Sequence, residues 1–173
     1  MNSKSIDTLQ ISELESIIKK FQREGGILDL SRYSMSDISL KKYMLSEVRA
    51  DNSVFINCSF EYAEMAGSVF SQTSAKSTNF SGAVLVKSEF YECDLQMASF
   101  CNAILTRGFL NKSNLTSVNF SGATLKFTSF IDCDLTDTLF ENADIEGCEF
   151  KDCTFNGVPW SGVKPPDSSC KST

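Results

Sequence analysis

The strongest constraint on the fold of this chain is a five-residue rhythm of apolar residues. Every fifth residue from Leu30 to Trp160 is apolar, 27 positions without an exception, and 11 of the 14 Phe residues lie in this register. An α-helix repeats every 3.6 residues and a strand every two residues, so neither element buries such a pattern on one face. We therefore expect the chain to bend every five residues and to bury one large side chain per bend.

Two further positions share this rhythm. Two residues before each large residue, from Val48 to Val158, the chain holds only Val, Ser, Cys, Ala, Thr or Gly. Two residues after it, Gly and Asn are enriched, as at Gly82, Gly122 and Asn102. Because Gly and Asn tolerate positive φ, this is where the backbone is expected to turn, with a small side chain filling the remaining space inside.

A longer period, made of four such blocks, lies over the shorter one. Positions 60, 80, 100, 120 and 140 are all Phe, and positions 95, 115 and 135 are all Leu. Four bends per circuit would close the chain on itself and stack equivalent side chains about 4.8 Å apart on neighbouring coils. The sequence therefore predicts a solenoid whose register is set by ladders of Phe and Leu.

Individual blocks identify a family resemblance. Thr78-Asn79-Phe80-Ser81-Gly82 and Ala143-Asp144-Ile145-Glu146-Gly147 resemble the pentapeptide-repeat consensus of a small residue, Asp or Asn, Leu or Phe, Ser or Thr, and Gly. The resemblance covers residues 28–162 and implies an all-β solenoid, a right-handed quadrilateral β-helix. Its 27 blocks give six full coils and three further sides, about seven coils in all. The small position holds Tyr33, Ile38 and Tyr43 in residues 28–52, so a wider or irregular first coil is expected there.

The two ends are expected to differ from the repeats. Within residues 1–27, positions 12–24 predict a short capping α-helix, with a capping box of Ser12 and Glu15 and a stop at Gly25-Gly26. Its apolar stripe comprises Leu14, Ile17, Ile18 and Phe21. Covering the first coil is the favoured role, and binding a partner is the alternative. Residues 163–173 are expected to form a flexible tail, which leaves the last coil available for an end-to-end homodimer.

Composition narrows the class of function. The formal charge of −6 and pI near 4.7 argue against direct nucleic-acid binding. No apolar run is long enough to span a membrane, and Met1–Ser12 lacks a signal-peptide core. Seven Cys without a CxxC pair favour reduced thiols and a cytoplasmic location, although export as an effector by a non-classical route stays open.

The cysteines mostly occupy the small inward position. These are Cys58, Cys93, Cys133, Cys148 and Cys153. The expected role is that of small buried residues. Cys133 and Cys153 should stack on adjacent coils, where a disulfide is geometrically conceivable but a reduced pair is favoured, and Cys101 should face outward.

Catalytic patterns are lacking in the sequence. Without histidine there is no Ser-His or Cys-His arrangement and no mixed Cys/His zinc site. Carboxylate pairs such as Glu89 and Glu92 would lie on a convex prism without a cleft, and no glycine-rich phosphate loop is present. We therefore expect a protein that is not an enzyme and that binds neither a cofactor nor a metal.

Two surface features suggest where a partner would bind. The first is a group of apolar residues with one base around one corner, the candidate partner surface: Val84, Val86, Tyr91, Ile104, Arg107, Phe109, Phe127 and Ile131. The second is an acidic collar near the C-terminal end, opposed only by Lys151: Asp132, Asp134, Asp137, Glu141, Asp144, Glu146, Glu149 and Asp152. The collar either keeps an open end monomeric or attracts a basic partner.

Three functions follow from these features and from the resemblance. The apolar corner favours a protein–protein interaction module whose partner is another protein. The family also includes acidic DNA mimics that bind or protect a type II topoisomerase (DNA gyrase), but these usually carry a C-terminal dimerisation helix and loops that this sequence lacks. The third function is that of a bacterial secreted effector or regulatory protein.

Overall fold

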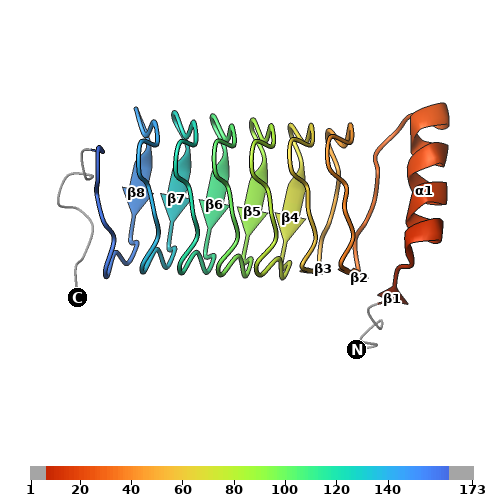
Figure 1. Ribbon diagram of the computed structural model, residues 1–173, viewed down its shortest axis with the longest axis horizontal. Helices are drawn as coiled ribbons and strands as arrows, with labels where there is room; N and C mark the ends of the chain where they lie inside the picture. Colours follow the sequence, from red (N-terminus) through yellow and green to blue (C-terminus); the bar gives the residue numbers. More distant parts are fainter. Residues whose placement is uncertain (1–6, 164–173) are drawn as a thin grey trace.

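A computed structural model describes residues 7–163 of the chain as a solenoid with one helix at its N-terminal end (Figure 1). The elements are β1 (Asp7–Thr8), α1 (Ile11–Glu24), β2 (Tyr33–Ser36), β3 (Val54–Ile56), β4 (Val69–Ser71), β5 (Glu89–Tyr91), β6 (Phe109–Asn111), β7 (Ser129–Ile131) and β8 (Glu149–Lys151). All strand pairs are parallel, with β1-β2-β3 in one sheet and β4-β5-β6-β7-β8 in the other.

Each turn of the solenoid places a residue beside its equivalent on the next coil. Phe70 pairs with Phe90 and Leu110 with Phe130, and bridges on the other sides, such as Ser99 to Asn119, keep the same spacing. Four bends per coil give a four-sided cross-section, and the chain completes about six turns. The fold class expected from the sequence is confirmed, with about six turns where about seven coils were expected.

The first coil is more regular than the sequence suggested. The bridges from Asp29 to Arg49 and from Ser39 to Ser59 already have the spacing of the later coils. Tyr33 and Tyr43 are only partly buried at the small position, so their rings reach the surface instead of widening the coil.

Two ladders of Phe form the centre of the solenoid. Phe80 stacks on Phe100 with ring centroids 4.8 Å apart, and Phe70 stacks on Phe90 at 4.7 Å. The two ladders meet edge to face, as between Phe80 and Phe90 at 83°. Parallel stacking along each ladder and T-shaped contacts between them are both favourable arrangements of aromatic rings.

The small inward position has a hydrogen-bonding role that sequence reasoning missed. Thr128 donates from Oγ1 to the carbonyl of Leu105 at 2.8 Å, and Thr138 donates to Leu115 at 2.8 Å. Ser53, Ser88 and Cys153 also have an acceptor 23 residues earlier, on the preceding coil. Some of these side chains, such as Ser113, have a second acceptor two residues earlier. Buried Ser, Thr and Cys side chains are therefore satisfied by main-chain oxygens, and their frequency at this position was the available signal.

The corners have positive φ whether or not they are Gly. Gly82 and Gly147 have φ of 65° and 68°, and Phe127 has a φ of 57° at an equivalent position. A Cβ built on Gly147 would lie 2.5 Å from the Phe127 ring, and one on Gly82 would lie 2.4 Å from the Tyr62 ring. These two glycines therefore provide the space for an aromatic ring from the preceding coil.

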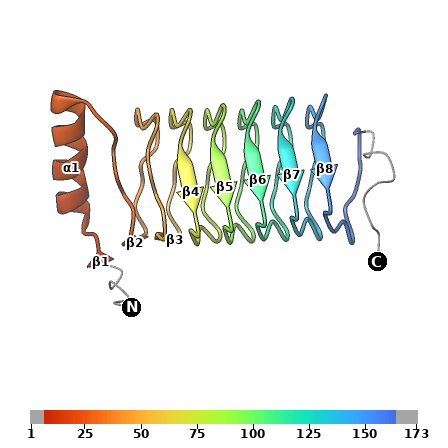
Figure 2. The ribbon, with the colours of Figure 1, turned by 180° about the vertical axis from the view of Figure 1, so that it is seen from behind.

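Helix α1 packs on the first coil (Figure 2). Leu14 and Ile18 are buried, and Ile17 and Phe21 are partly buried against the same core. The helix ends at Gly25, whose φ is 71°, as expected.

The start of α1 differs from the prediction. Gln10 is the N-cap and makes no side-chain capping hydrogen bond, so the predicted capping box of Ser12 and Glu15 is wrong. Preceding the helix, β1 pairs with β2 and extends that sheet beyond the first coil. The unpredicted strand β1 covers an edge that would otherwise expose unpaired backbone groups.

At the C-terminal end, Phe155 and Trp160 are only partly buried, and Trp160 stacks on Phe140 with centroids 5.4 Å apart. Apart from Val163, the predicted flexible tail lies outside the described residues. Among residues 7–163, no helix is long and apolar enough to cross a membrane.

Candidate interaction surface

The candidate partner surface surrounds the corner between the side that carries Leu85, Leu105 and Leu125 and the side formed by β4–β8. Phe127 is the most exposed of its apolar residues, with 55% of its area accessible, and Ile104 follows with 38%. Val84 and Ile104 are paired on adjacent coils and form a continuous apolar row. Val86 and Phe109 are half-buried on either side of the corner.

On the β4–β8 side the surface is interrupted. The pairing of β5, β6 and β7 places Asn111 between Tyr91 and Ile131, so these two apolar residues are two coils apart. Lys112 also lies over the Tyr91 ring, 5.6 Å from its centroid, and donates to the Tyr91 hydroxyl at 3.4 Å. The apolar character is therefore concentrated at Phe127 and Ile104.

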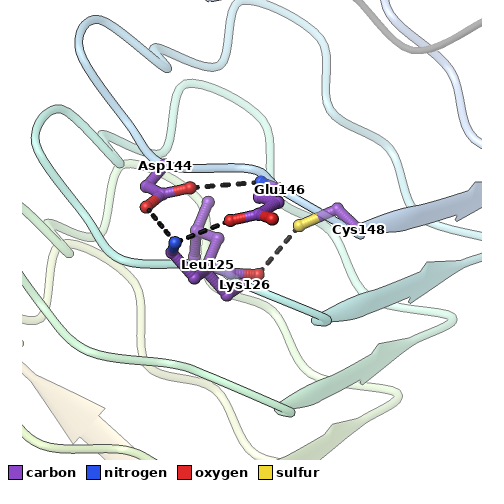
Figure 3. Close-up of polar contacts among 5 residues, drawn as sticks. All are labelled: Leu125, Lys126, Asp144, Glu146 and Cys148. Carbon is purple, nitrogen blue, oxygen red and sulfur yellow. Dashed lines mark hydrogen bonds and ion pairs between the residues drawn. The ribbon is translucent and has the colours of Figure 1, made fainter.

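The acidic collar is exposed at all eight positions. Part of its charge is neutralised locally, because Lys126 lies 2.7 Å from Glu146 and 3.1 Å from Asp144 (Figure 3). These contacts raise the pKa of the Lys126 ammonium and lower the pKa of the Asp144 carboxyl. The remaining six carboxylates make no ion pair within the described residues.

The cysteines are placed as expected. All six in the described residues are free, and Cys170 lies outside them. Burial raises the pKa of the Cys93 and Cys148 thiols to about 12. The pKa of Cys133 is raised by its hydrogen bond with Cys153 and by burial. Cys101 is on the outer face and partly exposed.

One open polar hollow of about 510 Å³ was not anticipated from the sequence. It lies on the first coils and is lined by Asp29, Ser31, Arg32, Asp51, Asn52 and Ser71. Oδ1 of Asp51 has no hydrogen-bond partner there. Within residues 7–163, no group of three or more His, Cys, Asp or Glu is arranged to hold a metal ion.

The regular coils and corners can be compared with known proteins. The sequence profile described as pentapeptide repeats matches in eight copies, over residues 69–107, 93–126 and 113–157. The chain belongs to the pentapeptide-repeat family. No curated protein matches it at the level of sequence.

Solved structures of pentapeptide-repeat proteins share this fold. A thylakoid-lumen protein of Arabidopsis thaliana is 22% identical, with a TM-score of 0.50, over 59% of this chain and 68% of that one. Full-length QnrB1, a plasmid-mediated fluoroquinolone resistance protein, is 17% identical, with a TM-score of 0.51, over 86% of this chain and 94% of that one. At these identities the likeness concerns the fold alone.

Proposed function

We propose that this pentapeptide-repeat protein is a non-enzymatic protein-interaction module that binds another protein at the candidate partner surface. The observation that supports the proposal most directly is the exposure of Phe127, 55% accessible at a corner where a smaller residue would suffice. Aromatic residues, Phe included, and Arg are enriched in protein interfaces relative to the rest of the protein surface.

The rigidity of the scaffold supports the same proposal. Each side of a coil is tied to its neighbours by main-chain hydrogen bonds, such as Arg107 N to Lys126 O at 2.9 Å and Phe127 N to Glu146 O at 2.9 Å. The corner residues are therefore held in place before a partner arrives, which reduces the entropy lost on binding.

A crosslinking and pull-down comparison tests this proposal. We expect the double substitution Phe109→Ser and Phe127→Ser to abolish capture of proteins retained by the unchanged chain. The double substitution Ile56→Ser and Met97→Ser, which alters two exposed apolar residues elsewhere, should leave capture unchanged. Identical retention by both variants would rule out the proposed surface.

A second candidate is an acidic mimic of DNA that binds or protects a type II topoisomerase such as DNA gyrase. It is favoured by the exposure of all eight collar carboxylates and by the fold shared with QnrB1, a fluoroquinolone resistance protein. A supercoiling assay with gyrase, with and without a fluoroquinolone, tests it. If the protein neither inhibits nor protects gyrase at high protein concentration, this candidate is excluded.

Two further predictions stay open to test. One is an end-to-end homodimer through the C-terminal coil, and the other is the role of a secreted effector or regulatory protein. Sedimentation velocity over a range of concentrations tests the homodimer. Affinity purification from the native cell, followed by mass spectrometry, addresses the partner and the compartment together.

A further inference from the structure

Some bases of the solenoid pair with an acid on the next coil. A side chain on one coil lies next to the side chain at the equivalent position of the following coil. Lys41 lies 2.7 Å from Glu61 and Lys126 lies 2.7 Å from Glu146, both across this step. Opposite charges facing each other on neighbouring strands are stabilising, whereas like charges are destabilising.

One corner breaks this rule. Lys87 and Arg107 occupy equivalent corner positions on adjacent coils, with φ of 58° each, and both are exposed. Neither side chain forms an ion pair or a hydrogen bond within the described part of the chain. Nowhere else in residues 28–162 does a base follow another base at this spacing.

Two unpaired bases at adjacent corners do not stabilise the coil. Local departures from stabilising patterns concentrate at functional sites. The same corner continues on the next coil with Phe127, and its flanks carry Val86 and Phe109. Along the corner the order is therefore base, base, exposed aromatic.

We infer that this corner binds an extended segment of a partner protein that carries acidic residues followed by an apolar residue. This inference rests on the proposed interaction function and adds the chemistry of the partner. Carboxylates of the segment pair with Lys87 and Arg107, and its apolar side chain packs on Phe127. Two coil steps of about 4.8 Å separate Lys87 from Phe127, a span that about three extended residues cover.

The collar fixes the direction of the bound segment. Beyond Phe127 the next coil carries Asp144 and Glu146, which share the single base Lys126. This net negative charge repels carboxylates, so the acidic part of the segment lies toward Lys87 and its apolar part toward Phe127. The corner is thus complementary to one orientation of the segment.

Fluorescence anisotropy with defined peptides tests the inference. The probe is a labelled synthetic peptide with two Asp followed by Leu and Phe, flanked by Gly-Ser. The comparison peptides carry Lys in place of Asp, or Ser in place of Leu and Phe. We expect only the acidic–apolar peptide to bind, and its affinity to fall about tenfold with Lys87→Gln and Arg107→Gln together.

The double substitution Lys42→Gln and Lys151→Gln is the matched control, since it removes two exposed bases that lie away from the corner. It should leave binding unchanged. Equal binding of the acidic and basic peptides, no binding of the acidic–apolar peptide, or equal losses in both double variants would each overturn the inference. Self-association of the unchanged chain in sedimentation, abolished by Lys87→Gln and Arg107→Gln, would also overturn it, because the collar of a second copy would then be the occupant.

The same variants separate this inference from the proposed function. If Phe109→Ser and Phe127→Ser abolish capture in the pull-down while Lys87→Gln and Arg107→Gln do not, the interaction function holds and the acidic partner is wrong. If none of these substitutions affects capture, the surface itself is wrong.

Discussion

At the scale of single residues, the small inward position combines two properties. The side chain there must be small enough to let the coils close. If it is polar, it must also have a hydrogen-bond partner inside the protein. Ser88 and Thr128 meet both conditions by donating to the carbonyls of Met65 and Leu105 at 2.9 and 2.8 Å. Ala83 and Ala103 meet only the first. Ser, Thr, Cys and Ala can therefore share one position of the repeat.

Replacing Thr128 with Val tests the hydrogen bond separately from the volume. Val keeps the shape of Thr but cannot donate to Leu105, so the free energy of unfolding should fall by about 1 kcal/mol. Urea denaturation measures the change. Thr124→Val, on the outer face, is the control and should have little effect. A stability loss at Thr124 as large as that at Thr128 would contradict this reading.

The buried thiols predict a loss of stability at alkaline pH. Burial raises the folded-state pKa of Cys93 and Cys148 to about 12 from the ordinary value of 9.0. Between about pH 9 and 12 the unfolded state releases these protons and the folded state does not, so stability is present below pH 9 and declines above it.

Thermal unfolding from pH 8 to 11 measures this decline. We expect the melting temperature of Cys93→Ala with Cys148→Ala to depend less on pH than that of the unchanged chain. At pH 8, a thiol reagent should modify the partly exposed Cys101 in the folded protein and leave Cys93 unmodified. Rapid modification of Cys93 without unfolding would contradict its burial.

At the scale of elements, the ladders were predictable and the ends were not. Positions such as Phe80 and Phe100 repeat at a fixed spacing, so their stacking follows from the period alone. The N-cap at Gln10 and strand β1 depend on contacts with the first coil, which no local pattern encodes. The interruption of the partner surface by Asn111 was also predictable, because residues 91, 111 and 131 have the same twenty-residue spacing.

Truncating one ring of a ladder should destabilise the whole solenoid. Phe100 is fully buried between Phe80 and Phe120, with centroids at 4.8 and 5.2 Å. Phe100→Ala should lower the free energy of unfolding by about 3–5 kcal/mol, because it leaves a cavity that the rigid coils cannot close. Phe127→Ala, at the exposed corner, should cost less than about 1 kcal/mol in the same urea titration. Similar losses for the two substitutions would show that the ladder is not the main source of stability.

At the scale of the whole molecule, the two ends of the solenoid are protected differently. At the N-terminal end, α1 and β1 lie against the first coil (Figure 1). Leu14 and Ile18 of α1 are buried there. At the C-terminal end, Phe155 and Trp160 are partly buried, and the acidic collar surrounds the last described coils. An uncovered coil presents unpaired backbone groups to other molecules, so the cover governs self-association.

Undocking the helix tests its role as a cover. Leu14→Asp with Ile18→Asp places charges against the core, so α1 should detach and the protein should self-associate through its first coil. Light scattering and size-exclusion chromatography measure this. Ser12→Asp with Lys19→Asp, on the exposed face of the helix, is the control and should stay at the size of the unchanged chain. A monomeric, equally stable Leu14→Asp, Ile18→Asp variant would show that α1 serves another purpose, such as partner binding.

The inward hydroxyl and thiol groups donate hydrogen bonds to carbonyls of the preceding coil, and this direction has a consequence for folding during translation. Thirteen of these side chains have a carbonyl acceptor 23 residues nearer the N-terminus. During translation the acceptors leave the ribosome before their donors. Each newly synthesised coil can therefore dock on a preceding coil that is already folded. The solenoid can thus fold one coil at a time during translation.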